Sequence, residues 1–271
     1  MDKILLKQKI AAWIDEHAAE QTAFLAKVVQ CPSDNPPGNC APHALMTAAL
    51  LEEMQFVVEQ HAVPTEFARS TGLESAINLI VREKFGDGPT VALNAHGDVV
   101  PPGAGWSVDP YSATVQDGWM IGRGAAVSKS DFATYAFALR ALKELAIPLR
   151  GQVELHLTYD EETGGLAGPG WLLQQGLSKP DYAICAGFSY NVTTAHNGCL
   201  HLEIKVHGTS AHAARPDTGH DALEAATRLL NELYKYRDSL QLRTSAISGI
   251  TSPSLVVGMI NGGINTNVVP D

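Results

Sequence analysis

The sequence predicts an α/β protein with a mostly parallel sheet, followed by a smaller α+β region. Three observations support this fold class: an apolar run at residues 90–95, a helical stripe of apolar residues at 132–145, and strict alternation at 153–159. Apolar positions repeat every 3.6 residues on a helix and every two residues on a strand. The three segments therefore form a strand, helix, strand unit, the building block of parallel sheets.

Helices are expected before this unit. Apolar residues recur at helical spacing between Ile10 and Val28, and the Pro- and Gly-rich turn at residues 35–38 ends that element. A second amphipathic helix is expected at residues 42–54.

The hydrophobic pattern changes in the later part of the chain. Apolar and polar residues alternate strictly at 200–206, as in a strand with one wet face. A helix at 221–240 and a strand at 255–260 are expected to follow, with the helix covering a small antiparallel sheet. We therefore expect two domains, residues 1–193 and residues 194–271.

Composition narrows the class of partner. The 271 residues are 45% hydrophobic and 18% charged, enough for a sizeable core. The net charge of -10 and the lack of a dense Lys/Arg block argue against nucleic acid or membrane as partners and favour a small-molecule substrate. No run is long enough to span a bilayer. The sequence has four cysteines, Cys31, Cys40, Cys185 and Cys199, and no C-x-x-C pair. This favours reduced thiols and a cytoplasmic location.

Two polar clusters follow the strands of the central unit. His96 and Asp98 come directly after the first strand, and Glu161 and Glu162 follow the second. Carboxyl ends of parallel strands meet at one sheet edge, so we expect one shared pocket. There an imidazole and a carboxylate can bind a divalent ion while a second carboxylate takes a proton from water. Each cluster alone also fits a structural interpretation, a chance tripeptide or a solvated acidic turn.

His212 lies between the alternating strand and the following helix. Loops held by rigid elements often carry function, and an imidazole placed there can donate a hydrogen bond to an oxyanion. The other interpretation is a solvated loop histidine.

Seven segments in this order resemble the M20 family of metallopeptidases, which includes acetylornithine deacetylase, succinyl-diaminopimelate desuccinylase, aminoacylase and glutamate carboxypeptidase. They are residues 32–38, 96–98, 106–111, 122–126, 160–165, 208–216 and 265–271. The resemblance implies a catalytic domain with an inserted ferredoxin-like lid that also forms a homodimer. It also implies that the catalytic domain continues beyond residue 271, so the chain is expected to be incomplete at its C-terminus.

The same resemblance assigns roles to individual residues. His96 is implied to be a metal ligand and Asp98 its orienting partner, while Glu161 is the general base and Glu162 a ligand of the other metal. In the lid, His212 polarises the scissile carbonyl across the dimer. Asn267 lines the same pocket.

The sequence departs from the family pattern at three ligands. Val127 stands where the family has an Asp that bridges two metals, and Gly187 lies where an acidic ligand is expected. The last ligand, a His, would lie beyond Asp271. Only His96 and Glu162 remain, and a zinc site normally needs about three or four protein donors.

Another residue could compensate. Asp131 lies one helical turn beyond Val127, where it is either a metal ligand or a favourable charge in the first turn of a helix. Cys185, His196 and Tyr190 are further candidate donors.

Two functions remain open. The first is a hydrolase that uses a metal-activated water to cleave an amide or related C–N bond of a small N-acyl amino acid or dipeptide-like substrate. Its cofactor would be Zn²⁺, or another divalent ion such as Mn²⁺ or Co²⁺, with one ion in place of two. The second is a catalytically silent homologue that binds a ligand and dimerises.

Overall fold

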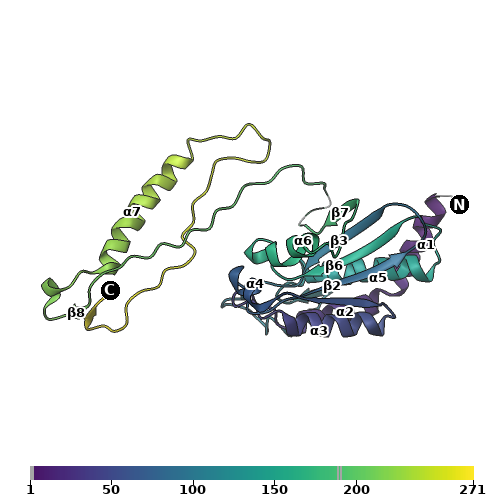
Figure 1. The fold of residues 1–271 in the computed structure, drawn as a ribbon, viewed down its shortest axis with the longest axis horizontal. Helices are drawn as coiled ribbons and strands as arrows, with labels where there is room; N and C mark the ends of the chain where they lie inside the picture. The colour runs from purple at the N-terminus through teal and green to yellow at the C-terminus, as the bar shows by residue number, and fades with distance from the viewer. Residues whose placement is uncertain (1–2, 188, 190) are drawn as a thin grey trace. The chain divides into compact units, whose positions relative to one another are not determined.

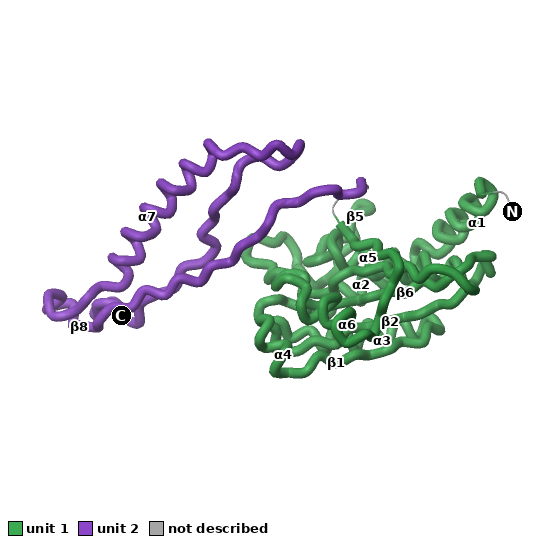
Figure 2. Tube along the Cα trace, turned by 45° about the horizontal axis from the view of Figure 1, so that its top comes forward, with its two compact units in different colours: residues 1–190 green, residues 191–271 purple. Residues whose placement is uncertain are grey.

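The computed structural model describes residues 3–187, 189 and 191–271. The chain divides into two compact units, residues 1–190 and residues 191–271 (Figure 2). Among the described residues, no helix combines the length and the hydropathy that a membrane crossing requires.

A five-stranded sheet forms the centre of the first unit, in the order β1-β2-β6-β3-β7 (Figure 1). Strand β3 pairs in parallel with β6 and β7, whereas β2 is antiparallel to both β1 and β6, so four of the five strands run in one direction. This confirms the predicted mostly parallel sheet. The strands are β1 (Val58–Ala62), β2 (Ile77–Lys84), β3 (Thr90–His96), β6 (Gln152–Thr158) and β7 (Tyr182–Cys185).

The predicted strand, helix, strand unit is present as β3, α5 (Lys129–Glu144) and β6. A hairpin of β4 (Thr114–Gln116) and β5 (Trp119–Ile121) lies between β3 and α5 in the sequence. Because β3 and β6 are parallel neighbours, their carboxyl ends lie at the same edge of the sheet, with His96 opposite Thr158.

The N-terminal helical region consists of two helices, α1 (Lys3–Glu16) and α2 (Ala18–Gln30). The break is at His17, whose backbone has φ -99° and ψ 11° and whose ring Nδ1 lies 2.8 Å from the carbonyl oxygen of Trp13. Helix α3 (Ala41–Glu53) matches the predicted second helix. The remaining helices of this unit, α4 (Thr65–Ser70) and α6 (Trp171–Gln174), are short.

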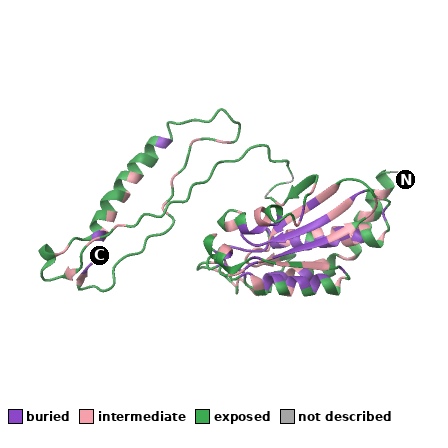
Figure 3. Ribbon diagram, in the orientation of Figure 1, coloured by how far each residue is buried: buried purple, intermediate pink, exposed green. Residues whose placement is uncertain are grey.

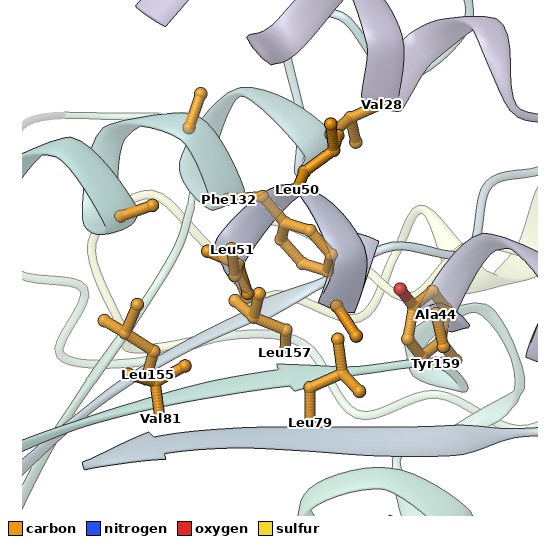
Figure 4. Packing of buried hydrophobic residues seen from close by; sticks show 14 of the residues in the cluster. Val28, Ala44, Leu50, Leu51, Leu79, Val81, Phe132, Leu155, Leu157 and Tyr159 are labelled. Atoms are coloured by element: carbon orange, nitrogen blue, oxygen red, sulfur yellow. The ribbon is translucent and has the colours of Figure 1, made fainter. Parts of the chain in front are cut away.

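The core lies between one face of the sheet and the helices. Leu155 and Leu157 of β6 pack with Phe132 of α5 and Leu51 of α3, and all four are buried (Figure 4). Side chains alternate between the two faces of a strand, so Glu154 points to the opposite face. This polar face is also covered, because Ser178 donates a hydrogen bond to Glu154 at 2.6 Å.

The second unit contains helix α7 (Ala222–Leu240), as predicted, and the Asp221 side chain caps it by accepting from Glu224 N at 2.8 Å. Its only strand pair among the described residues is β8 (Ala211–His212) with β9 (Val268–Val269). The second unit is largely exposed (Figure 3).

The prediction of strands at residues 200–206 and 255–260 was wrong, and no sheet made of them lies under α7. Neither segment has a backbone hydrogen-bond partner among the described residues. The exposed fractions of Leu200 and Leu202 are 79% and 74%. Alternation describes where side chains point, but a strand also needs a neighbour for its backbone groups.

Candidate metal site

The two polar clusters meet at the carboxyl edge of the sheet, as predicted. His96 ends β3, and Glu161 and Glu162 begin a 3₁₀ turn that is separated from the end of β6 by two residues. His96 Nε2 lies 3.8 Å from Glu161 Oε2, and one ligand atom from each of the three side chains lies within 4.8 Å of the others.

The Asp98 carboxylate contacts all three members of the cluster. Its carboxylate is fully buried and accepts hydrogen bonds from the backbone N–H groups of Glu161 (3.3 Å) and Glu162 (3.2 Å). His96 Nδ1 lies 3.3 Å from Asp98 Oδ1 and 3.0 Å from the Asp98 carbonyl oxygen. Both partners of Nδ1 are acceptors, so Nδ1 carries the proton and Nε2 offers a lone pair to the cluster.

The charges of the cluster favour a cation. Burial by itself raises the pKa of the Glu162 carboxyl, and the charges of Glu161 and Asp98 raise it further. Burial alone would lower the pKa of His96, but the hydrogen bond and charge of Asp98 raise it above its ordinary value. A divalent ion would relieve the repulsion between the carboxylates.

One donor pair of the cluster can be compared with two ligands of a single ion. Protein N and O donors lie about 2.0–2.2 Å from zinc, so two ligands of one ion are separated by at most about 4.3 Å. The 3.8 Å separation of His96 Nε2 and Glu161 Oε2 is within that limit. Imidazole nitrogen and carboxylate oxygen are donors that suit Zn²⁺, Mn²⁺ or Co²⁺.

The absence of a side chain at Gly97 lets the backbone after β3 lie close to two buried aromatic rings. A Cβ at this position would lie 2.5 Å from Tyr159 Cε1 and 2.9 Å from Phe132 Cζ, and both rings are fully buried. Gly97→Ala is therefore expected to lower the free energy of unfolding by about 1–3 kcal/mol, the usual cost of overpacking a core.

Urea denaturation measures this effect. Gly187→Ala is the matched control, because a Cβ at Gly187 meets nothing within 4 Å. Equal stabilities of the two variants would show that the rings below Gly97 yield without cost.

Asp131 is not brought into the cluster. It lies in the first turn of α5, and its carboxylate accepts a hydrogen bond from Ser128 Oγ at 3.2 Å. The group of mutually close ligand atoms contains His96, Glu161 and Glu162 without Asp131. This geometry favours the interpretation as a first-turn helix charge, and the ligand role stays an unsupported prediction.

The other candidate donors do not join the group either. Cys185 ends β7 and is exposed, and His196 lies in the second unit with its Nδ1 2.8 Å from the Asn197 carbonyl oxygen. Tyr190 lies outside the described residues.

His212 and Asn267 lie close together in the second unit. His212 pairs with Val268 across β8 and β9, and Ala213 N donates to the Asn267 carbonyl oxygen at 3.0 Å. The backbone N–H of Ala214 donates to His212 Nδ1 at 3.1 Å, so the proton of the neutral ring is on Nε2. His212 thus presents a hydrogen-bond donor at an exposed position.

Two buried polar residues beside the cluster were not predicted. The Asn35 amide donates to Asp98 Oδ2 at 2.9 Å, and the Lys129 ammonium donates to the Cys31 carbonyl oxygen at 2.9 Å. Asn35 is 1% exposed and Lys129 is fully buried. Asn35 lies in one of the family-like segments, which was the only available signal for it, and nothing in the sequence singles out Lys129.

Comparison with known proteins finds curated relatives of this chain. It is 30% identical over 169 residues to a succinyl-diaminopimelate desuccinylase of Nautilia profundicola, covering 59% of this chain and 45% of that protein. It is 32% identical over 226 residues to an acetylornithine deacetylase of Myxococcus xanthus, covering 82% and 57%. The chain thus spans about half the length of these curated relatives.

Solved structures share the fold. Human carnosine dipeptidase 1 matches 66% of this chain and 40% of its own with a TM-score of 0.55 and 23% identity. A tripeptidase of Staphylococcus aureus matches 93% and 63% with a TM-score of 0.51 and 22% identity. The protein-family model described as "Peptidase family M20/M25/M40" matches residues 92–261. The chain belongs to this family.

Proposed function

We propose that the chain is a metal-dependent hydrolase that cleaves an amide or related C–N bond of a small N-acyl amino acid or dipeptide-like substrate. The observation that carries this proposal is the cluster of His96, Glu161 and Glu162 above the buried Asp98. The names of the relatives, a desuccinylase and a deacetylase, support an N-acyl substrate.

His96 and Glu162 would hold the ion, with Zn²⁺, Mn²⁺ or Co²⁺ as candidates. When bound, such an ion supplies Lewis acidity, which polarises a carbonyl group and acidifies water. Glu161 is 62% exposed and lies beside His96 Nε2, so solvent water can reach its carboxylate. It takes the proton of the attacking water and returns it to the leaving amine. Asp98 keeps the His96 ring oriented.

His212 would stabilise the negative charge that develops on the carbonyl oxygen. The Ala214 amide occupies Nδ1, which leaves the Nε2 proton free to donate. Asn267, on the neighbouring strand, would line the same part of the substrate site. We also propose that residues 194–271 form a lid and the contact of a homodimer. A cytoplasmic location is a further proposal.

Val127 favours a second candidate, a silent homologue that binds a ligand without turning it over. A valine side chain offers no oxygen where the family has its bridging carboxylate. Both candidates keep the cluster of His96, Glu161 and Glu162, so turnover of a substrate is what distinguishes them.

Purified chain supplied with Zn²⁺, Mn²⁺ or Co²⁺ tests the proposal. N-acetyl and N-succinyl amino acids and dipeptides are offered, and release of a primary amine is followed. We expect release that stops when a chelator removes the ion and returns when the ion is restored. Bound metal with no release from any of these substrates would favour the silent homologue.

A further inference from the structure

The loop between α2 and α3 lies directly beside the strand end that carries the site. Asn35 N donates to the Val99 carbonyl oxygen at 2.8 Å, and Val99 N donates to that of Ser33 at 3.1 Å. Ser33 Oγ adds a hydrogen bond to the Gly97 carbonyl oxygen at 2.5 Å. These contacts fix the loop backbone on both sides of Asp98, so the Asn35 side chain has a defined position.

The Asn35 side chain is directed at Asp98. Its Nδ2 donates to Asp98 Oδ2 at 2.9 Å and lies 3.5 Å from Thr163 Oγ1. The amide cannot be turned round, because its oxygen would then face the Asp98 carboxylate. In this orientation Asn35 Oδ1 is buried without a hydrogen-bond partner among the described residues. A buried unpaired polar atom costs about 1–3 kcal/mol, so stability alone does not explain an asparagine here.

We propose that Asn35 is a positioning residue of the metal site that acts through Asp98. By binding Oδ2, the amide holds the Asp98 carboxylate so that Oδ1 faces His96 Nδ1. That contact keeps the His96 proton on Nδ1 and Nε2 directed toward Glu161 and Glu162. The inference rests on the proposed metal site and extends it to a residue that contacts neither the ion nor the substrate.

Asn35→Leu tests this role, since leucine has the same branching but neither polar atom. Asn78→Leu is a matched control: Asn78 is fully buried, its Nδ2 donates to the Ala167 carbonyl oxygen at 2.8 Å, and its Oδ1 is also unpaired. The readout is the Zn²⁺ dissociation constant of the folded chain, measured by competition with a chelating indicator. Circular dichroism confirms folding.

We expect Asn35→Leu to weaken Zn²⁺ binding about tenfold to a hundredfold, the usual effect of removing a residue that orients a ligand. Asn78→Leu should stay within about twofold of the unmodified chain, because its amide donates to the Ala167 carbonyl oxygen and not to Asp98. If Asn35→Leu does not fold, Asn35→Ala and Asn78→Ala take the place of the two leucine variants. The expected changes in Zn²⁺ affinity are the same.

Two results would overturn the inference. One is unchanged Zn²⁺ affinity in the Asn35 variant, and the other is equal weakening in both variants, which would indicate a general packing effect. Failure of the unmodified chain to bind Zn²⁺ would instead contradict the proposed metal site itself, so the two failures are distinguishable.

Discussion

Glu161→Gln is expected to lower kcat about a hundredfold to ten-thousandfold, the usual range for loss of a general base. The amide keeps the size of the side chain but cannot accept the proton of water. Because His96 and Glu162 are the proposed ligands, the metal content of the variant should stay unchanged.

Steady-state kinetics and elemental analysis of the same preparation check both statements. Glu52→Gln, which changes an exposed carboxylate of α3, is the control and should leave kcat unchanged. If Glu161→Gln instead loses the ion, Glu161 is a ligand and another group is the base.

Lys129→Met is expected to stabilise the chain by about 2 kcal/mol at pH 7. Burial lowers the pKa of Lys129 from 10.5 to about 8, with the charges of its acidic neighbours opposing the shift only in part. A difference of this size corresponds to about 3 kcal/mol, from which the lost hydrogen bond to Cys31 subtracts about 1 kcal/mol.

The pH dependence identifies the cause. Between pH 8 and pH 10.5 the unfolded chain binds more protons at Lys129 than the folded chain does, so the stability of the unmodified protein rises with pH across this window. The advantage of Lys129→Met should therefore shrink from pH 8 upward. Denaturation at pH 7, 9 and 10.5 measures it, and a variant that is less stable at pH 7 would show that the ammonium makes a net favourable contribution.

The central part of the fold was predictable because its signals are local. The apolar run of β3 and the alternation of β6 define two strands, and the intervening helix makes them parallel. That topology alone brings His96 and Glu162 to one edge. Strand β2 was missed, although residues 77–81 are mostly apolar, because no motif follows it.

Features that depend on tertiary contacts were not predictable. The alternation at residues 200–206 indicates which side chains share a face but not which backbone could pair with the segment. Helical spacing places Asp131 near the site without fixing the direction of its side chain. The burial of Asn35 and Lys129 depends on a loop that lies beside residues far away in the sequence.

The metal content of the purified chain tests the account most directly. After loading with Zn²⁺ and extensive dialysis, we expect no more than one ion per chain, since Val127 and Gly187 supply no carboxylate for a second. His96→Ala should remove the remaining ion, because it deletes the only imidazole of the cluster. Two tightly held ions in the unmodified chain, or one that persists in His96→Ala, would contradict the assignment of His96 and Glu162 as the ligands of a single ion.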